Sequence, residues 1–340
     1  MRPFGQRMLL GIVLGVASVL AVGCGSTTTA TTTRTATKDR SDTSEVGTLN
    51  GAAPKSTVGA PRTTKPLKSA PPARSLSTTI DPLRPFVVNV AKSYDPAVAA
   101  PLLIVLHGYT GTGESMKKYV GIQSLANARG FLTVYPDGTK DGAGAGFWNA
   151  TVACCNFGAV DIDDSAYLAS IIDAVSANYR VDPKRVYFLG HSNGGFMSYR
   201  MACEHADKVA AIVSIAGAAN GQAGVCKPSE PVSVLQIHGT ADPTIAYAGG
   251  SIGRLSYPSA VESVASWVGT NSCAARPTES TVRLDLVADL AGKETTVSSF
   301  APCSRAAAEL WSMNGAGHSP VFSATFAANV LDFLMAHPKE

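Results

Sequence analysis

The first 85 residues of the 340-residue chain almost entirely lack aromatic side chains, since Phe4 is the single one among them. A segment without aromatic residues cannot bury enough apolar surface to offset the conformational entropy that folding removes. We therefore expect the folded domain to begin near Phe86. The remaining residues, about 255 in number, are enough for one well-buried domain.

Charged residues are also scarce, at 16% of the chain, and the formal net charge is only +3. The charge is unevenly distributed. Residues 1–85 hold 11 basic and 4 acidic residues, whereas residues 86–340 hold 17 and 21. A mild basic excess outside the folding part of a chain is not a basic patch on a folded surface. We therefore expect no nucleic-acid partner.

The N-terminal apolar run, Met8–Val22, is too short for a permanent membrane helix, and basic residues precede it. These features are typical of an export signal. The run leads into LAVGC at residues 20–24, which resembles a bacterial lipobox and would make Cys24 a lipidation site, because a thiolate can accept the lipid. An ordinary cleaved signal with an incidental cysteine is the alternative. We expect residues 1–24 to be a signal peptide with a lipobox.

Residues 25–85 are rich in Thr and Pro and show no hydrophobic periodicity, which predicts a disordered tether. Residues 86–340 would then form the catalytic domain described below. The protein is expected to be exported, and either lipid-anchored to the bacterial cell envelope or extracellular. Its N-terminal lipid would be its only contact with a membrane.

The chain has seven cysteines and no C-x-x-C spacing, so we expect no metal site. If Cys24 carries lipid, six cysteines remain, and an even number in an exported chain favours disulfides. Cys273 and Cys303 bracket an apparent hairpin and are the first candidates for a pair. The adjacent Cys154 and Cys155 could bond to different partners or to each other.

From Phe86 onward, buried strands alternate with amphipathic helices, which predicts an α/β fold with a mostly parallel, doubly wound sheet. The run PLLIVL at residues 101–106 is almost continuously apolar, as a strand covered on both faces requires. The expected strands are 86–91, 101–106, 131–135, 185–189, 210–215, 232–237, 281–287, 295–300 and 309–313. The expected helices are 114–129, 164–179, 194–205, 259–268 and 322–336.

Residues 190–194, Gly-His-Ser-Asn-Gly, follow the apolar strand RVYFL and precede a helix. This is the G-x-S-x-G motif in its strand–turn–helix setting, where two glycines permit a tight turn that exposes the serine. The helix N-terminus offers backbone N–H groups and a partial positive charge. The motif therefore predicts that Ser192 is a nucleophile.

A serine nucleophile needs a base, and the base needs an orienting acid, in the chain order Ser, Asp or Glu, His. Asp242 and His318 fit this order, because each follows the end of an expected strand. His238 also ends a strand, but its position four residues before Asp242 favours a role in shaping that loop. We expect Ser192, Asp242 and His318 to meet at one edge of the sheet.

Acyl transfer also needs two N–H donors directed at the developing oxyanion. The expected donors are the backbone amides of Asn193, which follows the nucleophile, and Tyr109, in the early loop HGYTG. Trp148 lies in a glycine-rich loop and could either contact the acyl group of a substrate or pack under the loop.

Residues from about 86 to 337 resemble the α/β-hydrolase fold. Within it they resemble the secreted esterase group that contains polyhydroxybutyrate depolymerase-like enzymes, feruloyl esterases and acetylxylan esterases (carbohydrate esterase family 1). This resemblance supports Ser192, Asp242 and His318 as a triad and does not select a substrate. The segments that carry it are LLIVLHGYTGTGES, FLTVYPDG, FWNATVACC, VDPKRVYFLGHSNGGFMSYRMACE, LQIHGTADPTIAY and GAGHSP.

The sequence departs from the pattern of this family in two respects. We find no polymer-binding module, and the loop after His318 lacks a Trp that is often found there. It implies a monomeric serine esterase without a cofactor, acting on feruloyl or acetyl esters of plant polysaccharide or on a polyester of the polyhydroxybutyrate type. A serine peptidase of the same fold and a non-catalytic surface binding protein are the alternatives.

Overall fold

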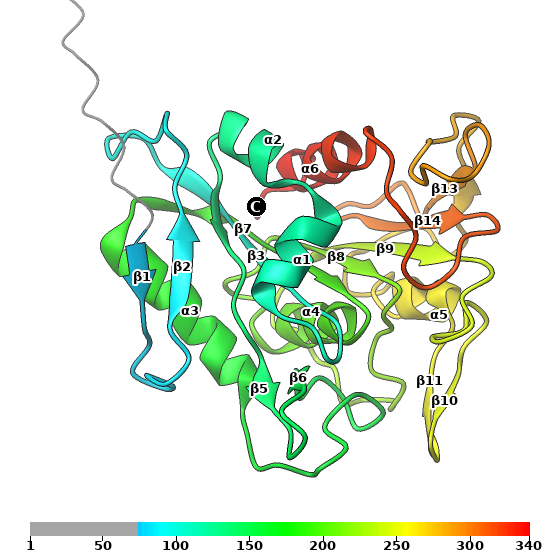
Figure 1. The fold of residues 1–340 in the computed structure, drawn as a ribbon. Helices are drawn as coiled ribbons and strands as arrows, with labels where there is room; N and C mark the ends of the chain where they lie inside the picture. The colour runs from blue at the N-terminus through cyan, green and yellow to red at the C-terminus, as the bar shows by residue number, and fades with distance from the viewer. Residues whose placement is uncertain (1–73) are drawn as a thin grey trace, which may run out of the picture. The chain divides into compact units, whose positions relative to one another are not determined.

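The computed structural model describes residues 74–340, whose main sheet has ten strands. The six central strands, from β4 to β14 in the order below, run parallel, and antiparallel strands complete both edges (Figure 1). The mostly parallel sheet expected from the sequence is thereby confirmed. The order is β1 (Arg74–Leu76), β2 (Phe86–Asn89), β4 (Leu132–Val134), β3 (Ala100–Leu106), β7 (Val181–His191), β8 (Ala211–Ile215), β9 (Ser233–Gly239), β14 (Ala308–Met313), β13 (Thr295–Ser299) and β12 (Thr278–Glu279).

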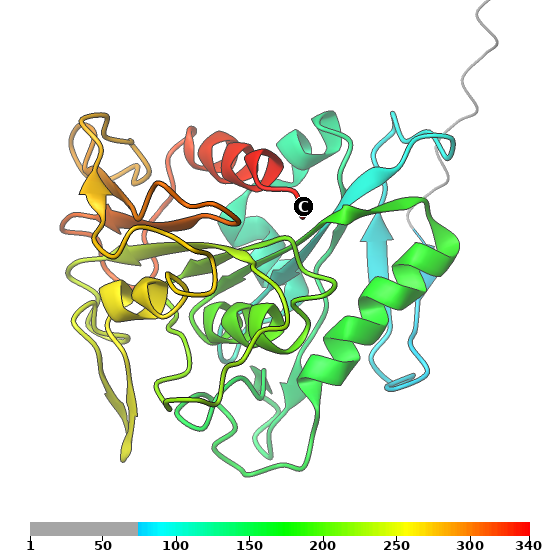
Figure 2. The same cartoon turned by 180° about the vertical axis from the view of Figure 1, so that it is seen from behind.

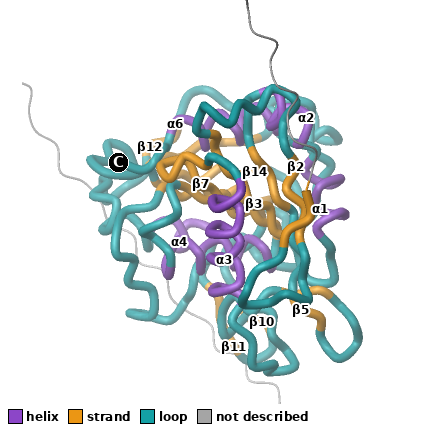
Figure 3. The backbone as a smooth tube through the Cα atoms, turned by 90° about the vertical axis from the view of Figure 1, so that its left-hand side faces the viewer, coloured by secondary structure: helices purple, strands orange, loops and turns teal. Residues whose placement is uncertain are grey.

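Helices cover both faces of this sheet, which Figures 1 and 2 show from opposite sides. The first face carries α1 (Gly113–Val120), α2 (Gln123–Ala128) and α6 (Phe326–Ala336). The second face carries α3 (Asp164–Asn178), α4 (Asn193–Glu204) and α5 (Ala260–Ala265). In Figure 3 the strands lie between α3 and α4 on one side and α1 and α2 on the other. Two small hairpins lie outside the main sheet: β5 (Thr139–Lys140) with β6 (Gly146–Phe147), and β10 (Gly250–Ile252) with β11 (Leu255–Tyr257).

The central strand β3 shows why the sheet needs both helix layers. All seven of its residues are buried, and successive side chains point to opposite faces. Leu102, Ile104 and Leu106 enter the core under α3, α4 and α5, whereas Leu103 and Val105 enter the core under α1, α2 and α6. A strand with this composition cannot leave either face in water.

The helix expected over residues 114–129 is wrong as a single element, because it consists of two short helices. Thr112 and Ser115 form a capping box at the start of α1, and Gly121 ends the helix with a φ of 60°. Glycine adopts this left-handed conformation without a steric penalty. The chain then restarts as α2 in a new direction.

The strand expected over residues 281–287 is also wrong, because these residues form a loop with isolated bridges at Leu284 and Val287. The partner of β13 is instead the short strand β12. At the other edge, β1 lies within the predicted tether and pairs with β2. The ordered chain therefore begins earlier than Phe86.

Three disulfides join the six cysteines of residues 74–340: Cys154–Cys155, Cys203–Cys226 and Cys273–Cys303. The adjacent pair is thus bonded to itself. Within residues 74–340, no helix combines the length and apolar character needed to cross a membrane. The expected export signal and Cys24 lie outside the described residues.

Candidate active site

Ser192 lies in the sharp turn between β7 and α4. Its backbone has a φ of 53° and a ψ of −121°, a conformation that L-residues rarely adopt. The flanking glycines make the turn possible. A Cβ atom at Gly190 would press against the carbonyl group of Gly194, and a Cβ at Gly194 would press against the carbonyl oxygen of Leu106. Strand β3 and the start of α4 therefore approach closely enough to hold the serine above the edge of the sheet.

Two other strands deliver the remaining expected residues to the same edge. Asp242 follows β9 and His318 follows β14, and these strands are parallel neighbours. The Nε2 atom of His318 lies 2.9 Å from the Ser192 Oγ, and its Nδ1 lies 2.7 Å from the Asp242 Oδ2. The structure thus brings together three residues that are separated by up to 126 positions in the chain.

Asp242 is held as a carboxylate. Its Oδ1 accepts hydrogen bonds from the backbone N–H groups of Thr244 and Ile245, at 2.8 and 2.9 Å. Burial raises the pKa of Asp242, but hydrogen bonds from His238, His318 and the Thr244 amide outweigh burial and leave the pKa well below its usual value. An ionised Asp242 requires the proton of His318 on Nδ1, which leaves Nε2 free to accept the Ser192 hydroxyl proton.

Of the two expected oxyanion donors, Asn193 begins α4 directly after Ser192, and Tyr109 lies in the loop after β3. The Asn193 N–H is at the first position of α4, where helix geometry provides no intrahelical acceptor. Tyr109 follows β3, lines the same cleft as Ser192, and turns its phenol toward Asp141 at 2.7 Å. The next residue, Thr110, donates its amide to the Gly146 carbonyl, which anchors the loop.

The expected contact of Trp148 with a substrate is contradicted, because its side chain is 0% exposed. Its indole N–H donates to the His107 carbonyl at 3.0 Å. The buried Asn193 side chain forms two hydrogen bonds with the Trp148 backbone, one to its N–H at 2.7 Å and one to its carbonyl at 2.9 Å. Trp148 therefore packs under the loop and fixes Asn193, the other alternative raised by the sequence.

His107 is a site residue that the sequence reasoning did not recognise. The side chain is buried, its Nδ1 donates to the Gly108 carbonyl at 2.8 Å, and its Nε2 accepts the Gly138 N–H at 2.9 Å. Burial lowers its pKa, so the ring is neutral near pH 7. His107 thereby ties the loop that carries Tyr109 to a segment 31 residues further along the chain. Only its place directly after an apolar strand could have signalled this role.

A cleft of about 290 Å³ opens beside Ser192 and His318. Tyr109, Tyr119 and His191 also line it. Through Tyr119 the cleft adjoins a second groove of about 560 Å³, whose walls include Pro320, Val321 and Phe322. The Ser192 and His318 side chains therefore line a cleft that could admit a molecule larger than the cleft itself.

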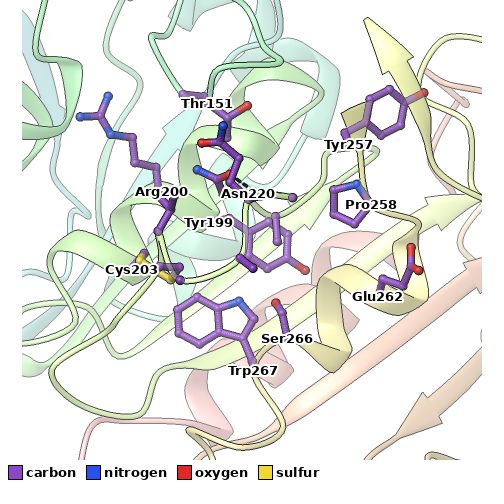
Figure 4. A pocket seen from close by; sticks show the side chains of 18 of the residues that line it. Thr151, Tyr199, Arg200, Cys203, Asn220, Tyr257, Pro258, Glu262, Ser266 and Trp267 are labelled. Carbon is purple, nitrogen blue, oxygen red and sulfur yellow. Dashed lines mark hydrogen bonds between the residues drawn. A yellow bond between two sulfur atoms is a disulfide. The ribbon is translucent and has the colours of Figure 1, made fainter. Parts of the chain in front are cut away.

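Another cavity, of about 570 Å³, lies away from the triad (Figure 4). Tyr199 and Trp267 stack within it at a ring-centroid distance of 6.4 Å, and the Cys203–Cys226 disulfide forms part of its wall. Neither Ser192 nor His318 lines this cavity. Within residues 74–340, histidine, cysteine and acidic side chains form no cluster of three or more that could hold a metal ion.

A family model described as Esterase PHB depolymerase matches residues 93–296 of the chain. Feruloyl esterase B of Piromyces equi is 29% identical over 206 residues, which are 58% of this chain and 37% of that protein. Feruloyl esterase C of Emericella nidulans is 28% identical over 174 residues, which are 49% of this chain and 58% of that protein. The chain therefore spans less than two thirds of the length of these curated relatives.

Among solved structures, an acetyl xylan esterase from Aspergillus awamori matches with a TM-score of 0.55. The match covers 77% of this chain and 98% of that chain, at 15% sequence identity. At this identity the match establishes a shared fold and leaves the chemistry to be argued from the site.

Proposed function

Since the chain belongs to the Esterase PHB depolymerase family and has the α/β-hydrolase fold, we propose that it is a serine carboxylic-ester hydrolase. The observation that carries the proposal is the continuous hydrogen-bond chain from Ser192 through His318 to Asp242 at a strained strand-to-helix turn. A strained backbone conformation lowers the stability of the fold, and such conformations are found mainly at functional sites. The three residues have the geometry of nucleophile, general base and orienting acid.

In the first half of the reaction, the Ser192 Oγ attacks the ester carbonyl carbon while its proton passes to the His318 Nε2. The carbonyl π electrons move to oxygen, and the Tyr109 and Asn193 N–H groups stabilise this oxyanion. The oxyanion then collapses, the bond to the alcohol oxygen breaks, and the leaving alcohol takes the proton from His318. An acyl-enzyme on Ser192 remains.

In the second half, His318 removes a proton from water, and the resulting hydroxide oxygen attacks the acyl carbon. The second oxyanion collapses, the bond to the Ser192 Oγ breaks, and the serine recovers its proton from His318. The ionised Asp242 stabilises the imidazolium ion in both halves because its Oδ2 lies 2.7 Å from the His318 Nδ1.

We further propose feruloyl or acetyl esters of plant polysaccharide, or polyesters of the polyhydroxybutyrate type, as substrates. The names of the two relatives support feruloyl esters, and the description of the matching family supports polyesters. The name of a further relative, a bifunctional acetylxylan esterase/xylanase of Neocallimastix patriciarum, supports acetyl esters. The open cleft and its adjoining groove give room for a polymeric alcohol or acid. Relative rates on methyl ferulate, acetylated xylan, short p-nitrophenyl esters and polyhydroxybutyrate would discriminate between them.

The same proposal places the enzyme outside the cytoplasm, as an exported monomer held by a lipid on Cys24 or released. The three disulfides of the described residues support export, because structural disulfides persist in oxidising compartments. A Cys24→Ser variant that remains fixed to the cell envelope would contradict the lipid anchor.

Replacing Ser192 with Ala tests the mechanism. We expect the kcat for a p-nitrophenyl ester to fall by about four to six orders of magnitude, with an unchanged thermal unfolding curve. A fluorophosphonate probe should label the unmodified protein at Ser192 and leave the variant unlabelled. Ser170→Ala, in α3 and remote from the cleft, is the control and should retain full activity.

Two outcomes would favour the alternatives. Hydrolysis of peptides but of no ester would indicate a peptidase, and an unmodified protein that neither reacts with the probe nor hydrolyses any ester would indicate a binding scaffold. Near-normal ester hydrolysis by Ser192→Ala would remove the assigned nucleophile.

A further inference from the structure

Strand β9 carries two buried polar side chains on one face. Gln236 is 0% exposed and His238 is 1% exposed, and both point to the same side as Val234 because strand side chains alternate. Burying polar groups costs free energy unless they form hydrogen bonds. The partners of these two residues therefore show what they do.

Gln236 determines which nitrogen of the His238 ring carries the proton. Its amide nitrogen donates to the Gly217 carbonyl and to the His238 Nδ1, both at 2.9 Å. The reverse orientation of the amide would place its oxygen against the Gly217 carbonyl oxygen, so the nitrogen must face this way. Because the His238 Nδ1 accepts a hydrogen bond, the ring carries its proton on Nε2.

The proton on the His238 Nε2 points at the turn that holds the candidate acid. It donates to the Ile245 carbonyl at 2.8 Å, and the Asp242 Oδ2 lies 3.3 Å from the same nitrogen. The Ile245 N–H in turn donates to the Asp242 Oδ1 at 2.9 Å. The Nε2 of His238 therefore contacts both the 242–245 turn, through the Ile245 carbonyl, and the carboxylate of Asp242.

We propose that His238 and Gln236 are positioning residues for catalysis, which extend the triad to a relay running from Gln236 through His238 and Asp242 to His318. The proposal rests on the serine esterase mechanism proposed above. The Oδ2 of Asp242 faces both histidines, so a proton on the His238 Nε2 fixes the rotation of the carboxylate that orients His318. The relay places the acid before the substrate arrives, which is the preorganisation that catalysis requires.

A purely structural role would need no such arrangement. The other face of β9 is filled by Leu235 and Ile237, which show that this strand packs well with apolar side chains. On the polar face, the hydrogen bonds lead from Gln236 through His238 to Asp242, with the Gly217 and Ile245 carbonyl groups as side branches.

The experiment compares three variants. His238→Leu removes the donor, His238→Gln returns an N–H near the position of Nε2, and Gln236→Leu removes the group that fixes the tautomer. His205→Gln is the matched control, because His205 also forms a partly buried hydrogen bond, to the Ser165 Oγ at 3.0 Å, but does not contact the triad. For each variant, kcat, KM, the rate of fluorophosphonate labelling at Ser192 and the thermal unfolding curve are measured.

We expect His238→Leu to lower kcat and the labelling rate by about 10- to 100-fold at an unchanged KM, because small misplacements of catalytic groups have effects of this size. His238→Gln should recover most of this loss, and Gln236→Leu should fall between the two. In NMR spectra, the far-downfield resonance of the His318 Nδ1 proton should broaden or shift in His238→Leu and Gln236→Leu and should stay in place in His205→Gln.

Failure of the inference and failure of the proposed function give different results. If the unmodified protein neither hydrolyses esters nor labels at Ser192, the proposed function fails. If it does both and His238→Leu keeps kcat, the relay is overturned. Should His238→Leu fail to fold, Gln236→Leu and His238→Gln decide, and a kcat equal to that of the control in Gln236→Leu overturns the proposal.

Discussion

His191, the residue before the proposed nucleophile Ser192, connects the turn between β7 and α4 to the loop that carries the proposed base, His318. Its Nε2 lies 2.9 Å from the His318 carbonyl oxygen and must donate, because a carbonyl only accepts. The ring also contacts Tyr119 edge-on, at a centroid distance of 5.0 Å. Burial is the main reason that the pKa of His191 falls to about 4, and it outweighs the opposing effect of the bond to His318.

This shift predicts a pH dependence of stability. In the folded state His191 takes up a proton only near pH 4, whereas in the unfolded state it does so near pH 6.5, so the unfolded state binds more protons between these values. Acidification from pH 6.5 to 4 should therefore cost the wild-type protein roughly 3 kcal/mol of unfolding free energy through this residue. His191→Gln retains an N–H donor but does not titrate, and should lose less stability over this range.

Urea unfolding at half-unit steps between pH 4 and 8 measures both proteins. The two curves are normalised at pH 8, where His191 is neutral in the folded and unfolded states alike. Besides His318, the charged or titratable groups that act on His191 are Asp242 and His238, and both remain in the variant. Parallel curves for the two proteins across the acidic range would contradict the prediction.

At this scale, residues within short motifs could be predicted and residues with distant partners could not. Ser192 lies in a five-residue motif, and Asp242 and His318 each follow a recognisable strand. The contacts of His107 and His238 depend on the turns at Gly138 and Ile245, which no spacing rule describes. The spacing of residues in the sequence indicates where a loop lies, but it does not show which of the loop's atoms face the site.

At the N-terminal edge of the sheet, residues before Phe86 are ordered although their composition predicted a disordered tether. Phe4 is the only aromatic residue before Phe86, yet Arg84 is held on several sides. Its Nη1 lies 2.7 Å from the buried Asp164 carboxylate, and its guanidinium lies 3.8 Å from the Tyr167 ring centroid. Its carbonyl accepts the Tyr167 hydroxyl at 2.9 Å. An ion pair and a strand ladder order this segment where apolar burial would not.

Loss of Arg84 should therefore destabilise the domain. Arg84→Ala would leave the fully buried Asp164 without its cation, and breaking a buried pair in this way typically costs about 3–5 kcal/mol. Arg283→Ala is the control, because its pair with Glu279 spans 3.6 Å between exposed side chains and should be worth less than about 1 kcal/mol. Chemical denaturation of the two variants measures the difference, and equal losses would show that the segment before Phe86 contributes little.

Elements with continuous apolar runs could be predicted with nearly correct bounds, as β3, β8 and β14 show. Elements that depend on one backbone conformation or on edge pairing could not. Gly121 divides a periodic pattern into α1 and α2 through a left-handed cap, and β1 and β12 are short strands defined by their partners alone. The parallel centre of the sheet is thus visible in the sequence, as are the antiparallel strands β2 and β13, whereas the outermost strands β1 and β12 are not.

For the whole molecule, the disulfides connect the proposed compartment with stability. Cys203–Cys226 and Cys273–Cys303 close loops whose ends are 23 and 30 residues apart. The second joins the chain after α5 to the segment that precedes β14, the strand that leads to His318. In a reducing compartment these links would be lost, and the unfolded chain would gain conformational freedom.

The double variant Cys273→Ser, Cys303→Ser should consequently have a free energy of unfolding about 3 to 4 kcal/mol lower than that of the oxidised wild-type protein. This is the effect expected for a loop of this length. Neither cysteine lines the cleft beside Ser192, so kcat per folded molecule should not change.

Thermal unfolding and ester hydrolysis are measured with and without a reducing agent. The reductant should destabilise the wild-type protein more than the double variant, which has one disulfide fewer to lose. A wild-type protein whose unfolding is insensitive to reductant would show that its stability does not depend on an oxidising compartment, and the disulfides would then cease to support export.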